Sequence, residues 1–283
     1  MPQTCIITDN TTQFTQSGFS GQSYVKVLPL VTNTDDRGEL FRDNTLRRTP
    51  SECNPIPGVD LISINSQNVN YIETILTISQ EYHQLLFILP ARTLSPAIIK
   101  IETLLNQITI PADVEIIDTQ TISLGVGWLV QVCAREIAAG KNLSQIKYYL
   151  INKIPHIYTL IYIYDLLNLK ELGLLDADQA LVGNLLGIHP LILLEKGHIL
   201  PYQKIRTIKS FGDVIQNYAN EFEQIQFIGI TYGSDIGVAD KKNLNYRVQS
   251  SFPKVKTEFQ LMNKTMDNIL GPQSIGVVLI DKG

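Results

Sequence analysis

Three side chains suited to chemistry, Asp9, Asp118 and Cys53, lie beside short apolar runs or in a loop of this sequence. An aspartate at the end of a strand can bind a metal ion or a phosphate group, and it is also a common turn or capping residue. A loop cysteine is a candidate nucleophile, but no histidine near Cys53 is identified as its base. The sequence also lacks the G-x-S-x-G pattern of serine hydrolases. These residues favour a binding protein over an enzyme.

Motifs for metals and cofactors are equally sparse. Neither CxxC nor HExxH occurs, and the four histidines are widely separated, so we expect no metal site. Gly125-Val126-Gly127 follows an apolar run as in a dinucleotide-binding loop, but Val130 stands where that motif has its third glycine. We therefore expect no cofactor. The histidines are His83, His156, His189 and His198.

The composition sets limits on size and partners. With 283 residues and 44% hydrophobic residues, the chain can fill more than one core, which favours two domains. The charged fraction is 18% and the formal net charge is -4, so the chain lacks the basic field that neutralises phosphates. Nucleic acid is therefore not an expected partner.

The chain shows no targeting or membrane signal. Residues 1–9 lack the basic region, apolar run and small-residue cleavage site of a signal peptide. The apolar stretch 156–164 ends at Asp165 and is well short of the roughly 20 residues that span a bilayer. We expect a cytoplasmic protein without a membrane span, in which Cys5, Cys53 and Cys133 stay reduced.

The elements that would position these residues follow from the hydrophobic pattern. In the first half, short apolar runs typical of buried strands alternate with amphipathic helical segments, and this pattern predicts an α/β domain with a mostly parallel sheet covered by helices on both faces. Pro29 favours an edge position for its strand. Ligands of such sheets bind at the carboxyl ends of the strands. The expected strands are 5–8, 24–32, 59–65, 85–89 and 114–117, and the expected helices are 69–84, 95–108 and 123–139.

After Lys153 strands and helices no longer alternate regularly, which predicts an α+β domain. The expected strands there are 191–194, 203–209, 227–232 and 275–280. We place the domains at residues 1–152 and 153–283.

Several segments, in order along the chain, resemble the DegV family, whose members have the EDD fold. They include Ile6 to Thr12, the proline-rich loop Pro50 to Pro55, Ala91 to Pro96, and Ile117 to Gly127. In the second half they include Leu185 to Ile192, Glu195 to Ile199, Lys204 to Thr207 and Gly271 to Gly276. The resemblance therefore extends over nearly the whole chain.

The resemblance implies a non-catalytic carrier for a long-chain fatty acid or related lipid, held at the junction of the two domains. A fatty-acid kinase or another acyl-handling enzyme is the implied protein partner. The alternative is a degenerate family member that binds a partner or regulates without binding a fatty acid. The candidate ligand-binding residues are Asn10, Thr11, Glu52, Cys53, Arg92, Thr93, Ser95, Gly125, His189, Lys204 and Arg206.

The sequence departs from the family pattern at four head-group positions. Glu52 and Arg92 replace hydroxyl residues, Leu174 replaces an arginine, and Ile269 replaces a histidine. A guanidinium can bind a carboxylate through two parallel hydrogen bonds, so Arg92 either anchors the lipid carboxylate or pairs with Glu52 and closes the site. A solvated surface arginine is the remaining alternative.

Two further features bear on a lipid ligand. Lys204 and Arg206 alternate along a strand-like stretch, so they either form a positive patch for a head group or partner, or are solvated on an edge strand. Apolar residues in 122–132 and 181–192 could line a tunnel for the tail, although ordinary core is the commoner role of such residues. Each buried methylene contributes on the order of 0.8 kcal/mol.

Overall fold

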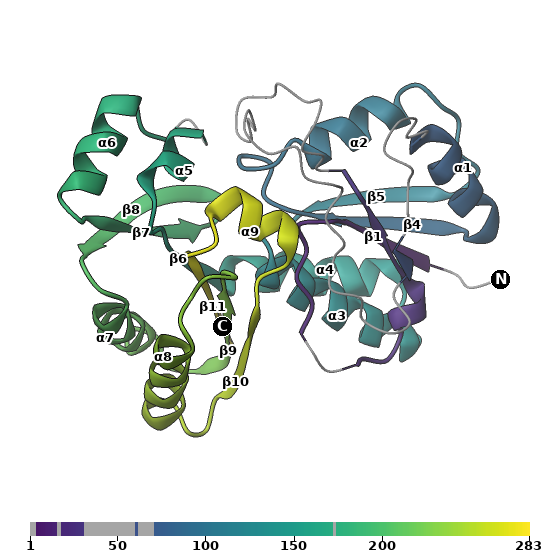
Figure 1. The fold of residues 1–283 in the computed structure, drawn as a ribbon. Coiled ribbons are helices and arrows are strands. Elements are labelled where there is room, and N and C mark those ends of the chain that lie inside the picture. The colour runs from purple at the N-terminus through teal and green to yellow at the C-terminus, as the bar shows by residue number, and fades with distance from the viewer. Residues whose placement is uncertain (1–3, 16–17, 31–59, 62–70, 172–173) are drawn as a thin grey trace. The chain divides into compact units, whose positions relative to one another are not determined.

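The structure is a computed structural model that describes residues 4–15, 18–30, 60–61, 71–171 and 174–283 (Figure 1). The chain divides into two compact units. Of the described residues, the first unit contains those up to Ile154 and the second contains Pro155–Gly283.

The first unit is an α/β domain with a parallel sheet, as the sequence predicted. The described strands lie in the order β3-β2-β1-β4-β5, and each pairs with its neighbour in parallel. In chain order the elements are β1 (Thr4–Asp9), the 3-10 turn η1 (Gln22–Tyr24), β2 (Val25–Leu28), β3 (Asp60–Leu61), α1 (Tyr71–Glu81), β4 (Gln84–Leu89), α2 (Ala97–Leu105), β5 (Asp113–Asp118), α3 (Leu124–Ala138) and α4 (Leu143–Lys153).

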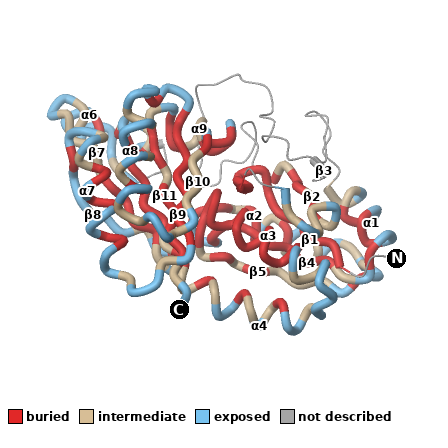
Figure 2. Tube along the Cα trace, turned by 90° about the horizontal axis from the view of Figure 1, so that it is seen from below, coloured by how far each residue is buried: buried red, intermediate tan, exposed pale blue. Residues whose placement is uncertain are grey.

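Helices cover both faces of this sheet, with α1 and α2 on one face and α3 and α4 on the other (Figure 1). Because side chains alternate along a strand, Cys5 and Ile7 of β1 pack with α1 and α2, while Ile6 points to the opposite face. Every residue of β1 is buried (Figure 2). The apolar runs lack a polar alternation because neither face of the sheet meets water.

The strand around Pro29 is shorter than predicted and is not at an edge. It ends at Leu28, and β2 lies between β3 and β1. Pro29 follows the strand, so its missing N–H removes no hydrogen bond from the sheet, and its carbonyl accepts a bond from the Tyr71 hydroxyl at 2.7 Å. The edge prediction was wrong because it placed the proline within the strand.

The second unit is built on a mixed sheet in the order β10-β9-β11-β6-β7-β8. β9 and β10 are parallel, and the other neighbours pair antiparallel. The chain enters it through the turn η2 (Ile154–His156), and its elements are β6 (Ile157–Tyr162), α5 (Leu166–Glu171), α6 (Ala177–Leu185), β7 (His189–Glu195), β8 (His198–Ile205), α7 (Ile208–Ala219), β9 (Ile225–Tyr232), α8 (Val238–Ser251), β10 (Lys256–Leu261), α9 (Lys264–Leu270) and β11 (Ile275–Asp281).

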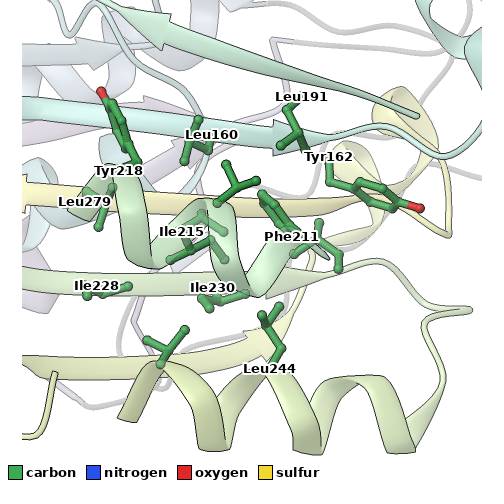
Figure 3. Close-up of a cluster of buried hydrophobic side chains, with 14 of the residues drawn as sticks. Leu160, Tyr162, Leu191, Phe211, Ile215, Tyr218, Ile228, Ile230, Leu244 and Leu279 are labelled. Carbon is green, nitrogen blue, oxygen red and sulfur yellow. The ribbon is translucent and has the colours of Figure 1, made fainter. Parts of the chain in front are cut away.

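The core of this unit lies between α7, α8 and one face of the sheet. Phe211 and Ile215 of α7 pack against Leu160, Ile230 and other strand residues (Figure 3). Thr207 caps α7, with its Oγ1 accepting a hydrogen bond from Ser210 N at 3.2 Å. The strand predicted for residues 203–209 therefore stops at Ile205, because a hydroxyl residue begins a helix there.

Candidate functional site

The order of the parallel strands identifies one edge of the first unit as the candidate site. Chain order reverses between β1 and β4, and ligands of such sheets bind outside the carboxyl ends of the strands at this switch point. The loops that leave β1 and β4 there contain Asn10 and Thr11, and Arg92, Thr93 and Ser95.

The loop after β1 is organised by the carboxylate of Asp9. Its Oδ1 accepts hydrogen bonds from Thr11 N at 3.2 Å, Thr11 Oγ1 at 2.8 Å and Thr12 Oγ1 at 3.2 Å. The Thr12 hydroxyl also lies 2.6 Å from the Thr8 hydroxyl. Asp9 is fully buried, and its other oxygen, Oδ2, has no hydrogen-bond partner among the described residues. Burial raises the pKa of Asp9 to about 6, although the bonds from Thr11 and Thr12 favour its charged form.

The loops after β1, β4 and β5 touch one another at the start of α3. Ala91 N donates to Thr121 O at 2.8 Å, and Gln13 N donates to Ser123 O at 3.2 Å. A Cβ on Gly127 would meet the carbonyl oxygen of Gln13 at 2.0 Å, so only glycine lets α3 approach this loop. The G-x-G pattern thus packs a helix against a loop.

Two residues at the start of α3, Ser123 and Gly125, have unusual local surroundings. Ser123 precedes α3 with a φ of 51°, in the left-handed region, and its buried hydroxyl has no hydrogen-bond partner among the described residues. Gly125 lies in the first turn of α3, where a Cβ would approach Thr121 Oγ1 to 2.5 Å. Close packing therefore sets the helix start that faces the loops.

Arg92 is paired on the protein surface. Its Nη1 and Nη2 bind the two carboxylate oxygens of Glu102 on α2, at 2.9 and 2.5 Å. The two side chains are 45% and 42% exposed. The hydrogen bond to Glu102 raises the pKa of Arg92, and the same bond lowers the pKa of Glu102. Arg92 N also donates to Asp118 Oδ1 at 3.3 Å, which ties the loops after β4 and β5 together.

The first unit thus gathers most of the residues proposed from the sequence. Asn10, Thr11 and Ser95 are buried, whereas Arg92 and Thr93 are exposed. Ser95 Oγ, two residues before α2, accepts a bond from Ala97 N at 3.3 Å. Glu52 and Cys53 lie outside the described residues, so a pairing of Arg92 with Glu52 stays a prediction.

The remaining predicted residues belong to the second unit. Lys204 and Arg206 are exposed on either side of the buried Ile205, at the end of the edge strand β8. Leu174 is exposed, and Ile269 is half-buried in α9.

His189, at the start of β7, lines a pocket of about 450 Å³ in the second unit. Its ring stacks on Tyr164, with the centroids 4.6 Å apart and the planes at 15°. Its Nδ1 lies 2.9 Å from the carbonyl oxygen of Tyr164. The pocket is lined by the loops around α5, before β7 and before β11, which contribute Tyr164, Asp165, Asn168, Asn184, Gly187, His189, Gly271, Pro272, Gln273 and Ser274.

Sequence reasoning missed Glu102 and Ser123 at the first site and Asp165 in the pocket. Ser123 could have been found as the polar residue two positions before Gly125, at the start of the expected helix. The partnership of Glu102 with Arg92 and the pocket around Asp165 depend on how loops fold against helices, which no local pattern reports.

The tail-lining candidates have mixed positions. From Leu124 to Val132, every residue of α3 is buried, as in ordinary core. In the other segment, Leu181, Val182, Leu185 and Leu186 are exposed by 53 to 79%.

In the part of the chain that the structure describes, no three histidine, cysteine or acidic side chains come together in a way that could hold a metal ion. No described helix is both long and apolar enough to cross a membrane.

Comparison with known proteins identifies relatives along the whole chain. The sequence model of "Uncharacterised protein, DegV family" matches residues 3–282. A DegV domain-containing protein of Streptococcus pyogenes serotype M3 is 32% identical over 132 residues, so the chain spans about half the length of this curated relative: 46% of each protein is matched.

Two solved structures share the fold over nearly their full length. The DegV family protein of Corynebacterium glutamicum aligns with a TM-score of 0.74 and 15% identity, covering 100% of this chain and 98% of that one. A DegV family protein of Thermus thermophilus, described as binding fatty acid, aligns with a TM-score of 0.71 and 18% identity, covering 99% of both chains.

Proposed function

The chain belongs to the DegV family, and from this premise we propose that it is a carrier that binds a long-chain fatty acid or a related lipid without performing chemistry on it. The observation that carries the proposal is the likeness in fold, over 99% of both chains, to the Thermus thermophilus protein described as binding fatty acid. We place the function in the cytoplasm and infer a fatty-acid kinase or another acyl-handling enzyme as the partner.

Arg92 is the residue proposed to hold the lipid carboxylate. It lies in the loop after β4, beside the switch point of the parallel sheet, where ligands of such folds bind. Both side chains of the Arg92–Glu102 ion pair are exposed, and exposed ion pairs contribute little to the stability of the folded state. A fatty carboxylate with an apolar tail can therefore compete with Glu102 for the guanidinium.

A second candidate function follows from the same contact. Glu102 occupies the guanidinium of Arg92 with both oxygens, and the family's arginine and histidine positions hold the apolar residues Leu174 and Ile269. In this alternative the ancestral head-group site is closed, and the protein acts by binding a partner or by regulation.

Native mass spectrometry of the purified protein, followed by organic extraction, separates the two functions. The carrier is expected to hold a fatty acid or related lipid, or to take one up after delipidation. If the purified protein contains no lipid and does not bind added fatty acids of several chain lengths, the carrier function is contradicted and the alternative is supported.

Three substitutions test the role of Arg92. Arg92→Ala removes the proposed anchor and should weaken fatty-acid binding, whereas Glu102→Gln releases the guanidinium and should strengthen it. Lys147→Ala is the matched control, because Lys147 forms an exposed ion pair with Glu115 at 2.8 Å in the same unit. Equal fatty-acid affinity in all three variants would remove Arg92 from the site without excluding a carrier that holds its lipid by the tail.

A further inference from the structure

The pocket of the second unit has a chemical character of its own. Its volume of about 450 Å³ lies within the usual range for small-molecule sites, about 300 to 1,000 Å³. Its lining contains one carboxylate, Asp165, three amide side chains and the stacked rings of Tyr164 and His189. Among the described residues, no lysine or arginine belongs to this lining.

Three hydrogen-bonding groups of the lining, Asn168 Nδ2, Ser274 Oγ and His189 Nδ1, are engaged with backbone carbonyls. Asn168 Nδ2 donates to Leu270 O at 3.1 Å, and Ser274 Oγ donates to the same carbonyl oxygen at 2.5 Å. His189 Nδ1 lies 2.9 Å from Tyr164 O, and because a carbonyl only accepts, Nδ1 carries the hydrogen. In the tautomer with the hydrogen on Nδ1, Nε2 is an acceptor.

The acceptors on the same residues stay available. Among the described residues, no hydrogen-bond donor contacts Asn168 Oδ1 or Ser274 Oγ, so both oxygens can accept. The carboxylate of Asp165 uses Oδ1 for Leu167 N at 2.9 Å and Asn184 Nδ2 at 2.7 Å, which leaves Oδ2. The amide of Gln273 can serve as donor or acceptor. The lining therefore offers several available acceptors beside the Asp165 carboxylate.

Two glycines with positive φ lie in the loops that line this pocket. At Gly271, with φ of 95°, a Cβ would lie 2.2 Å from Asn168 Nδ2, so glycine allows the turn before β11 to approach α5. At Gly187, with φ of 59°, a Cβ would meet no described residue within 4 Å.

We propose that this pocket binds a small organic molecule through an ammonium group, which Asp165 and the neighbouring acceptors recognise while the Tyr164–His189 stack contacts the apolar part. A cation with several N–H donors complements a lining of acceptors, and the face of a tyrosine ring attracts cations. A carboxylate would instead face Asp165, and no described residue of the lining supplies a compensating cation. The proposal does not depend on fatty-acid binding.

A matched pair of probes tests the charge preference. Phenylethylammonium and 3-phenylpropanoate have the same ring and a two-carbon link but opposite charges. The full chain is titrated with each probe, and NMR monitors the imidazole signals of His189. A His189→Gln variant assigns these signals. Binding at other sites is then not counted. Phenylethylammonium should shift these signals at a concentration about tenfold lower than 3-phenylpropanoate. Equal or preferred binding of the anion at His189 would overturn the proposal.

Two further measurements test Asp165 itself. Asp165→Asn keeps Oδ1 for its bonds to Leu167 and Asn184 but removes the charge, and should weaken phenylethylammonium binding about tenfold. The control Asp178→Asn changes an exposed aspartate of α6 outside the lining and should leave the affinity unchanged. If Asp165→Asn does not fold, the wild-type affinity should still fall as salt is raised from about 0.01 to about 0.15 M. An affinity that is insensitive to both the variant and salt would overturn the role of Asp165.

Discussion

At the scale of single residues, Asp9 sets a pH dependence for the first unit. Its pKa in the folded protein, about 6, exceeds its ordinary value of 3.8 because the carboxyl is buried. Between these values the folded state binds more protons than the unfolded state, so the free energy of unfolding falls as pH rises from about 4 to about 6. The full effect is at most about 3 kcal/mol.

Asp9→Asn should remove this pH dependence. The amide keeps an oxygen for Thr11 and Thr12 and never ionises, so the variant should match the wild type near pH 4 and exceed its stability above pH 6. Urea unfolding from pH 4 to 8 measures the difference, with the exposed Asp113→Asn as control. A wild-type stability that rises through this window relative to Asp9→Asn would contradict the assignment.

The sequence identified the positions of Asp9 and Arg92 at strand ends but not their states. The protonation of Asp9 depends on burial by segments distant in the chain. The partner of Arg92, Glu102, lies ten residues away on the next helix, and the turn that joins loop and helix decides whether the two meet. The positions of Asp9 and Arg92 near strand ends were predictable. The pKa of Asp9 and the ion-pair partner of Arg92 could be known only from the packed structure.

At the scale of elements, the contact between α3 and the loop after β1 gives a stability prediction. Gly127→Ala would place a Cβ 2.0 Å from the Gln13 carbonyl oxygen, and backbone cannot rotate away as a side chain can. The free energy of unfolding should fall by on the order of 3 kcal/mol.

Urea unfolding checks this value, with Gly18→Ala as the control. Gly18 is exposed, and among the described residues a Cβ there would meet only Gln22 Oε1, at 3.6 Å, so the change should stay within about 0.5 kcal/mol. A loss at Gly127 no larger than that at Gly18 would mean that the loop shifts readily and does not fix the start of α3.

Elements were predictable where burial is uniform and were missed where it is not. The runs of β4, β9 and β11 are almost wholly apolar and were found. β10 was missed because it is an edge strand in which Gln260 alone is buried, so its sequence looks polar. β6 was considered only as a membrane-spanning stretch and rejected as too short, although it is an interior strand of the second sheet.

At the scale of the whole molecule, a bound lipid should stabilise the folded protein. A ligand that binds only the folded state adds about 2.7 kcal/mol when its free concentration is about 100 times its Kd. For a protein of this size that corresponds to a rise in Tm of roughly 5 °C. Calorimetry of the delipidated protein, with a fatty acid kept below its micelle concentration, measures the shift.

The fatty alcohol of the same chain length separates the contributions of the head group and the tail. If Arg92 holds the carboxylate, the acid should raise Tm more than the alcohol, and Arg92→Ala should abolish this difference while the tail's contribution remains. Each unit has its own core, so the two units can unfold in separate thermal transitions. The shift of each transition then reports which unit the lipid contacts. A lipid that contacts both units raises both transition temperatures, whereas a lipid held within one unit raises only that one. No shift with any fatty acid or alcohol would contradict the carrier function itself.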